Sequence, residues 1–289
     1  MTRLRVVVLF GGQSVEREVS RISARTICGG LDPARYEVIP LAVGRDGRFL
    51  AAADSAKLLA SGPVPPRYRD AEPSSEALVP AEIAPGRADI VLPIIHGTTG
   101  EDGALQGFLQ TLGLPYVGAG VTASAVGMDK GVFKALLRDA GIPTPASIVI
   151  RSVAEGRDPR VRMGLPLFVK PACGGSSVGV TKVKRSEDFE PAVELALRYD
   201  ERVLVEQGID ARELECAVLG NEDPKASIPG EIVPGHEFYD YDDKYRDDKA
   251  KLLIPAAVPP AVAEETRRLA VAVFRLFGKC RTLGGSVAS

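Results

Sequence analysis

The chain has 289 residues, of which 45% are hydrophobic and 26% charged, and its formal net charge is −2. This length suffices for two or three compact units, and the ordinary composition indicates a folded protein rather than a disordered one. The 36 basic and 38 acidic residues leave no positive excess, so neither nucleic acid nor an anionic membrane surface is favoured as a partner.

Targeting signals and cysteine clusters are also missing from the sequence. The run through Phe10 lacks the apolar region and cleavage site of a signal peptide, and no segment approaches the roughly 18 apolar residues of a membrane span. The four cysteines contain no C-x-x-C pair, which argues against a zinc site and a disulfide framework. We therefore expect a cytoplasmic protein.

The N-terminal part predicts a parallel α/β unit. Leu4 to Phe10 is an apolar, β-branched run that stops at Gly11 and Gly12, as a strand buried on both faces does. Ser14 or Ser20 could cap a helix over Arg21–Leu31. Further strands are expected at 36–43, 89–95 and 116–117 and helices at 101–112 and 130–140, whereas 51–85 is not assigned.

The second half predicts antiparallel strands with two helices. Expected strands are 147–150, 167–170, 178–183, 203–206, 213–219, 230–233 and 252–257, and expected helices are 186–199 and 260–277. We expect three domains, at 1–120, 121–205 and 206–289.

A glycine- and serine-rich loop is the most specific feature. Lys170 ends an apolar strand, and the loop that follows contains Gly174-Gly175-Ser176-Ser177. Glycines let backbone N–H groups close on phosphate oxygens, while the serines and the ammonium add donors. The loop matches neither the P-loop nor the dinucleotide-binding pattern, and a flexible hairpin turn is the alternative.

Four further motifs accompany this loop, and together they resemble the D-alanine:D-alanine ligases of the ATP-grasp superfamily. They are FGGQSVEREVS at 10–20, HGTTGEDGALQG at 96–107, MDK at 128–130 and FYDYDDKY at 238–245. The resemblance implies an ATP-grasp fold of mixed α/β and α+β class. A Rossmann-like parallel-sheet domain would come first, then a small central antiparallel domain and an incomplete C-terminal ATP-grasp domain.

The resemblance also implies a reaction. ATP phosphorylates the carboxylate of one D-alanine, and the amine of a second D-alanine attacks the acyl phosphate to give the dipeptide used for peptidoglycan. The nucleotide site that the resemblance implies has Lys130, Lys170 and Ser177 at the phosphates. Glu206 and Glu213 would receive adenine and ribose, with Glu215 as the alternative in another register.

For the amino acid, the resemblance pairs Glu16 with the ammonium of the first D-alanine and places it in a triad with Ser176 and Tyr245. His96 would meet the substrate carboxylate. The polar stretch 235–251 resembles a loop that closes over the substrates, and the resemblance implies D-alanine as the second substrate because the tyrosine-lysine-tyrosine pattern with Lys244 is present.

The last residues depart from the family. Past Gly278 the family continues into Gly-x-x-Arg-x-Asp and Glu-x-Asn patterns that hold Mg²⁺ or Mn²⁺, and residues 279–289 contain neither. The sequence thus predicts a truncated chain without these metal ligands. Three functions remain: an active ligase, an inactive remnant that binds nucleotide or D-alanine, and another ATP-grasp ligase, against which the triad argues. Family members commonly form homodimers, and the residues leave dimerisation open.

Overall fold

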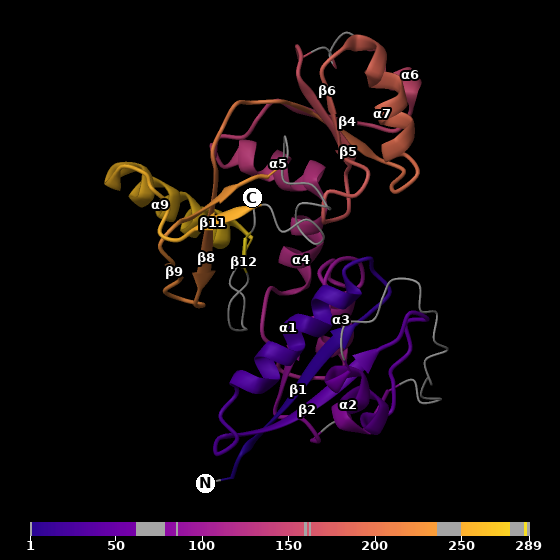
Figure 1. The fold of residues 1–289 in the computed structure, drawn as a ribbon, viewed down its shortest axis with the longest axis vertical. Helices are drawn as coiled ribbons and strands as arrows, with labels where there is room; N and C mark the ends of the chain where they lie inside the picture. Colours follow the sequence, from indigo (N-terminus) through magenta and orange to yellow (C-terminus); the bar gives the residue numbers. More distant parts are fainter. Residues whose placement is uncertain are drawn as a thin grey trace. The chain divides into compact units, whose positions relative to one another are not determined.

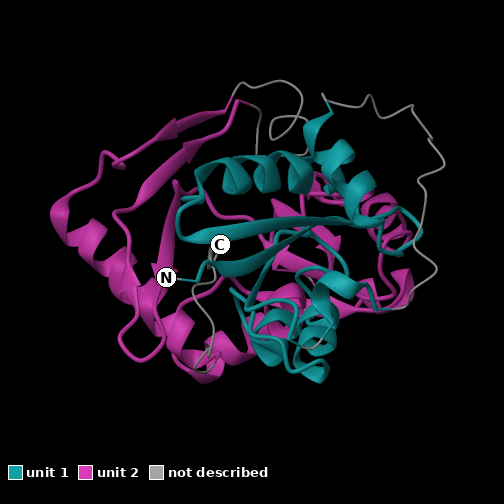
Figure 2. Ribbon diagram, turned by 90° about the horizontal axis from the view of Figure 1, so that it is seen from below, with its two compact units in different colours: residues 1–125, 280–284 teal, residues 126–279, 285–289 magenta. Residues whose placement is uncertain are grey.

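The computed structural model describes residues 2–61, 79–84, 86–158, 161, 163–235, 250–277 and 286–287. The chain divides into two compact units, Met1–Ala125 with Cys280–Gly284 (unit 1) and Val126–Lys279 with Gly285–Ser289 (unit 2), coloured separately in Figure 2. The division falls within helix α4 (Val121–Met128). The three-domain division remains a proposal. In the described part of the chain, no helix is both long and apolar enough to span a membrane.

Unit 1 is built on a parallel sheet, as predicted. Strand β1 (Leu4–Gly11) lies between β2 (Tyr36–Val43) and β3 (Ile90–Pro93), and both pairings are parallel (Figure 1). The apolar run of β1 is buried on both faces because successive side chains point to opposite sides of the strand.

Two hydrophobic clusters cover the faces of this sheet. Val6, Val8 and Phe10 pack with residues of α1 (Arg17–Gly30) and α2 (Ala52–Ala60). Val7 and Leu9 pack on the other side with residues of α3 (Ala104–Thr111) and of a 3₁₀ turn at Ala81–Ile83. The strand expected at 116–117 is reduced to a single parallel bridge between Tyr116 and Val91.

Helix α1 begins earlier than expected, at Arg17, with Glu16 in the N-cap position and no side-chain cap bond. Both serine caps suggested by the sequence are therefore wrong. Ser20 lies inside the helix, where its hydroxyl donates to the Ile94 carbonyl and accepts the Gly11 N–H at 2.9 Å. This hydroxyl ties the carboxyl ends of β1 and β3 together.

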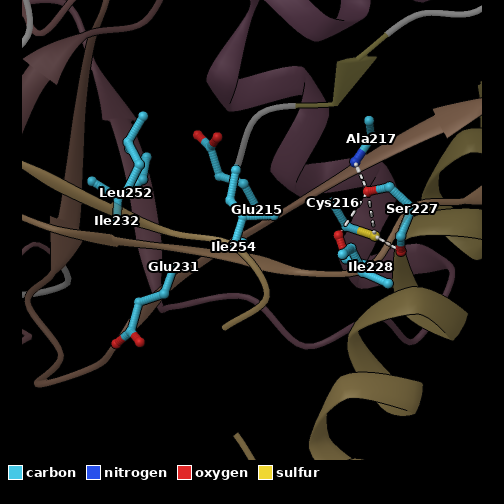
Figure 3. Close-up of a pocket in the computed structure, with 10 residues that line it drawn as sticks. Glu215, Cys216, Ala217, Ser227, Ile228, Glu231, Ile232, Leu252 and Ile254 are labelled. Carbon is cyan, nitrogen blue, oxygen red and sulfur yellow. Dashed lines mark hydrogen bonds between the residues drawn. The ribbon is translucent and has the colours of Figure 1, made fainter. Parts of the chain in front are cut away.

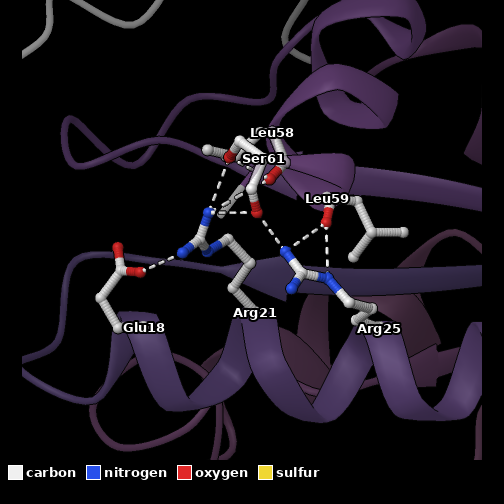
Figure 4. A network of polar contacts seen from close by, with 6 residues as sticks. All are labelled: Glu18, Arg21, Arg25, Leu58, Leu59 and Ser61. Atoms are coloured by element: carbon white, nitrogen blue, oxygen red, sulfur yellow. Dashed lines mark hydrogen bonds and ion pairs between the residues drawn. The ribbon is translucent and has the colours of Figure 1, made fainter. Parts of the chain in front are cut away.

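Helix α2 lies in the stretch that the sequence left unassigned, and its last carbonyls are capped from α1 (Figure 4). Arg21 donates to the Ser61 hydroxyl at 2.7 Å and to the Leu58 carbonyl at 3.4 Å, and Arg25 donates to the Leu59 carbonyl at 2.8 Å. Glu18 pairs with Arg21 at 2.8 Å. Carbonyls at a helix end lack partners within the helix, so these guanidinium groups complete the hydrogen bonding of α2.

Unit 2 contains an antiparallel four-stranded sheet in the order β4-β7-β5-β6. Its strands are β4 (Ser147–Ile150), β7 (Val203–Gln207), β5 (Leu167–Pro171) and β6 (Thr181–Val183). One face packs on α7 (Phe189–Ala196) and α6 (Val153–Gly156), and a 3₁₀ turn at Ser186–Asp188 precedes α7. Strand β6 starts three residues later than expected because 176–179 form a turn.

The second sheet of unit 2 has the order β11-β10-β8-β12, and β9 pairs with β8. Its strands are β8 (Glu213–Leu219), β9 (Lys225–Ala226), β10 (Gly230–Val233), β11 (Lys251–Leu253) and β12 (Ser286–Val287). Helix α9 (Pro260–Leu276) lies against β8 (Figure 1). The strand expected through Ala257 ends at Leu253, because the antiparallel pairing with β10 stops there.

Candidate active site

Two of the sequence motifs meet at the carboxyl edge of the parallel sheet in unit 1. Strand β1 ends at Gly11, and the chain after β3 leads to His96 and Gly97. Gly97 has a φ of +74°, and a Cβ added there would lie 2.8 Å from Glu16 Oε2. The Glu16 carboxylate therefore lies against the backbone of the second motif, which requires glycine at this position.

His96 lies in this cluster with polar groups on both ring nitrogens. Its Nδ1 is 3.5 Å from Glu101 Oε1, and its Nε2 is 3.4 Å from the Ser23 hydroxyl. Glu101 also accepts the Gly97 N–H at 2.7 Å. The hydrogen bond with Glu101 raises the pKa of His96, although partial burial opposes it and the charge of Glu16 assists. The cationic imidazole is thereby favoured, which suits a site for a carboxylate.

The phosphate-loop candidate of unit 2 follows β5, with Ser176 and Ser177 at φ of +50° and +58°. Such values are uncommon for residues other than glycine and cost energy, so two in succession make this loop a candidate for function. Gly174 and Gly179 take φ of +134° and +71° in the same loop. Successive N–H groups in turn conformations form the concave surfaces that bind anions.

Lys130 reaches this loop from the start of helix α5 (Lys130–Asp139). Its backbone N–H donates to the Ala172 carbonyl at 2.9 Å, and its Nζ donates to the Gly174 carbonyl at 2.7 Å. Burial, reinforced by the positive charge of Lys170, lowers the pKa of the Lys130 ammonium to about 8. An anion bound in the loop would favour the charged ammonium and so oppose the lowering of its pKa by burial and by Lys170.

Lys170 lies on the face of the sheet opposite α7, where its ammonium pairs with Glu206 of β7. Lys134 of α5 binds the same carboxylate at 2.6 Å and the Thr144 hydroxyl at 2.8 Å. Burial alone would raise the pKa of Glu206, but Lys170 and Lys134 outweigh it and hold that pKa below its ordinary value. The sequence reasoning missed Lys134, and the available signal was its i, i+4 spacing from Lys130 on one helix face.

Glu213 and Glu215 lie two residues apart on β8, so strand alternation places them on the same face. Glu213 is partly buried and pairs in register with Ile232 of β10. Glu215 is exposed and lines a cavity of about 440 Å³ whose apolar wall includes Leu252 and Ile254 (Figure 3). The choice between the two carboxylates stays a prediction.

The predicted triad, Lys244 and the metal ligands remain to be considered. Lys244 and Tyr245 lie outside the described residues. The proposed triad combines Glu16 of unit 1, Ser176 of unit 2 and Tyr245, and it remains a prediction. Among the described residues, no group of three His, Cys, Asp or Glu side chains could hold a metal ion. The described residues therefore do not fit the metal site that the family implies.

The parallel unit with its Glu16 and His96 cluster and the antiparallel unit with its lysine-lined glycine loop together define an ATP-grasp type of protein. Computed comparison with solved structures agrees. The D-alanine-D-alanine ligase from Coxiella burnetii matches with a TM-score of 0.78 at 36% identity, covering 96% of this chain and 78% of that one. The VanG D-Ala:D-Ser ligase from Enterococcus faecalis matches with a TM-score of 0.79 at 29% identity, covering 96% and 83%.

Sequence comparisons specify the family. Family models described as D-ala D-ala ligase N-terminus and D-ala D-ala ligase C-terminus match residues 5–119 and 136–284. D-alanine–D-alanine ligase A from Chromobacterium violaceum is 46% identical over 292 aligned positions, covering 95% of this chain and 80% of that protein. Its counterpart from Escherichia coli K12 is 43% identical, covering 96% and 81%. The chain belongs to the D-alanine–D-alanine ligase family, which confirms the resemblance and the predicted fold class.

Proposed function

We propose that this protein joins two D-alanine molecules into D-alanyl-D-alanine for peptidoglycan, using ATP and an acyl phosphate intermediate. The observation that carries the proposal is the phosphate loop, where Lys130 of α5 donates to the Gly174 carbonyl and the charge of Lys170, at the end of β5, acts on the Lys130 ammonium. A dense cationic site of this kind stabilises the negative charge of a triphosphate as the phosphoryl group moves.

In the first step, a carboxylate oxygen of the first D-alanine attacks the γ-phosphorus, and ADP leaves. Lys130, Lys170 and the loop N–H groups, with the Ser177 hydroxyl, stabilise the charge on the phosphate oxygens. Glu206 and Glu213 face adenine and ribose in this proposal, where a carboxylate accepts hydrogen bonds from ribose hydroxyls. Because Glu206 also pairs with Lys134 and Lys170, it links nucleotide recognition to the position of the phosphate-binding lysine.

In the second step, the deprotonated amine of the second D-alanine attacks the acyl carbon, and inorganic phosphate leaves. Glu16 holds the ammonium of the first D-alanine, in a triad with Ser176 and Tyr245. The cationic His96 holds a substrate carboxylate, consistent with its raised pKa. Lys244 and the loop that carries it exclude water, which would otherwise hydrolyse the acyl phosphate.

Magnesium or manganese would neutralise phosphate charge when bound, but no step here is assigned to it because the described residues provide no ligand set. A cytoplasmic location and a homodimer complete the proposal. The location suits a reaction that consumes ATP, and homodimers are common in the family.

The test is phosphate release by the purified chain with ATP, Mg²⁺ and D-alanine, beside a Lys170→Ala variant. We expect release that requires D-alanine and falls by at least about 100-fold in the variant, because an uncompensated phosphate charge costs several kcal/mol. Nucleotide binding without phosphate release would favour the inactive remnant instead. Release with other amino acids but not with D-alanine would favour a different ATP-grasp ligase.

A further inference from the structure

Arg202, the residue that precedes β7, contacts both the start of α5 and the phosphate loop. Its Nη2 lies 2.8 Å from Asp129 Oδ2 and 3.3 Å from the Cys173 sulfur. The side chains of Arg202 and Asp129 are 25% and 13% exposed, so the pair is largely shielded from water. The reaction described above does not use this pair.

Asp129 links Arg202 to helix α5. Its Oδ1 caps α5 by accepting the N–H groups of Gly131 and Val132 at 3.0 and 3.1 Å, while its Oδ2 binds Arg202. One carboxylate therefore connects Arg202 with the first turn of the helix. The first residue of that turn is Lys130, whose ammonium donates to the Gly174 carbonyl.

The loop side of the contact is also fixed. Asp200 accepts the Cys173 N–H at 2.6 Å and the Arg202 N–H at 3.1 Å through its two carboxylate oxygens. The Arg202 carbonyl accepts the Ala172 N–H at 2.9 Å. The Asp200 carboxylate and the Arg202 carbonyl thus hold the base of the phosphate loop, and the guanidinium of Arg202 connects it to α5 through Asp129.

We propose that Arg202 is a positioning residue for ATP binding, which holds the capped N-terminus of α5 against the phosphate loop and so aims Lys130 at the phosphates. The inference rests on the proposed function, because it assigns ATP to this loop. Arg202 also neutralises Asp129, which would otherwise pair with the Lys130 ammonium and draw it away from the loop. Planar arginine donors suit such a bridge better than lysine.

The experiment measures ATP affinity by calorimetry and the KM values for ATP and D-alanine in Arg202→Gln. We expect ATP affinity to fall by about tenfold, while KM for D-alanine rises much less, because Glu16 and His96 belong to unit 1, although Ser176 of the proposed triad lies in the loop. Arg157→Gln is the matched control, since Arg157 also forms a two-point ion pair, with Glu190, but on the exposed side of unit 2. Arg202→Lys should restore part of the affinity.

A pH profile separates positioning from a general loss of structure. In Arg202→Gln the negative charge of Asp129 is no longer compensated and should raise the pKa of Lys130. ATP affinity should then begin to fall at a higher pH than in the wild type. Asp129 and Asp200 carry negative charge near Lys130, and Lys170 carries positive charge, so removal of Arg202 changes that balance. Unfolding of a fraction of the molecules lowers the number that bind ATP and leaves this pH unchanged in those that stay folded.

The outcomes are distinct. A wild-type chain that fails to bind ATP overturns the proposed function, whereas a wild type that binds ATP with the same affinity as Arg202→Gln overturns the positioning role. Equal rises in both KM values would also overturn it. Should Arg202→Gln fail to fold, Asp129→Asn replaces it, because the amide oxygen keeps the cap and loses the charge that binds Arg202; about the same tenfold loss is expected.

Discussion

Lys130 combines burial and charge beside the predicted phosphate loop. Its pKa of about 8 lies below the ordinary value of 10.5 because the ammonium is buried and lies near Lys170. Between these two pH values the unfolded chain binds the proton more tightly than the folded chain does. This residue therefore makes the free energy of unfolding increase as pH rises from about 8. The destabilisation caused by burying the charged ammonium is fully present below that pH.

ATP affinity should also depend on the protonation of Lys130. Bound phosphates favour the charged ammonium, so binding above pH 8 takes up a proton, and ATP affinity should fall as pH rises from about 8 to about 9.5. One proton limits this fall to about tenfold per pH unit. Calorimetry in buffers of different ionisation enthalpy measures the uptake. Lys130→Met should bind ATP more weakly and lose the pH dependence, whereas the exposed Lys225→Met should keep it; a wild-type affinity that is flat over this range contradicts the assignment.

At the scale of elements, helix α2 depends on side chains of another helix. Its own sequence is alanine-rich, and its N-cap residue Ala51 makes no side-chain bond. The carbonyls at its C-terminal end are bound by Arg21 and Arg25 of α1, and the Arg21 side chain is only 3% exposed. Capping and packing of α2 are therefore tertiary properties.

Arg21→Met should accordingly lower the free energy of unfolding by about 1.5–3 kcal/mol, the usual contribution of hydrogen bonds to a charged group. Arg48→Met provides the comparison, because Arg48 is exposed and its ion pair with Asp46 is 4.0 Å long. That control should change stability by less than about 0.5 kcal/mol. Denaturant titrations of both variants decide the matter, and equal effects would show that the buried arginine does not stabilise the helix pair.

At the scale of the whole molecule, ATP binding and folding are coupled. A ligand at 100 times its dissociation constant stabilises the folded state by about 2.7 kcal/mol, so ATP should raise the unfolding midpoint by about 5–10 °C. AMP lacks the β- and γ-phosphates that the lysines neutralise and should raise it much less. Differential scanning calorimetry compares the two nucleotides. Equal shifts for AMP and ATP would mean that the loop with Lys130 and Lys170 does not bind the phosphates.

Much of the fold could be predicted from the sequence because its signals are local. A continuous apolar run ending in glycine gave β1, regular spacing gave α9, and five ordered motifs gave the family. The elements that were missed lack a side-chain cap at their N-termini. Helix α2 is completed by Arg21 and Arg25, and the first turn of α1 is held by the Ser20 hydroxyl, which bonds to Gly11 and Ile94, rather than by a serine cap.

The candidate site divides in the same way. The sequence by itself determined the family and which residues are predicted to carry the chemistry, because Lys130, Lys170, Glu16 and His96 stand within motifs. Only the tertiary structure decided their partners: Glu101 and Ser23 for His96, Lys134 for Glu206, and the Arg202–Asp129 contact beside Lys130. A motif is a local pattern of residue types and can be read from the sequence. A pKa or an ion pair depends on charges and burial supplied by residues distant in sequence.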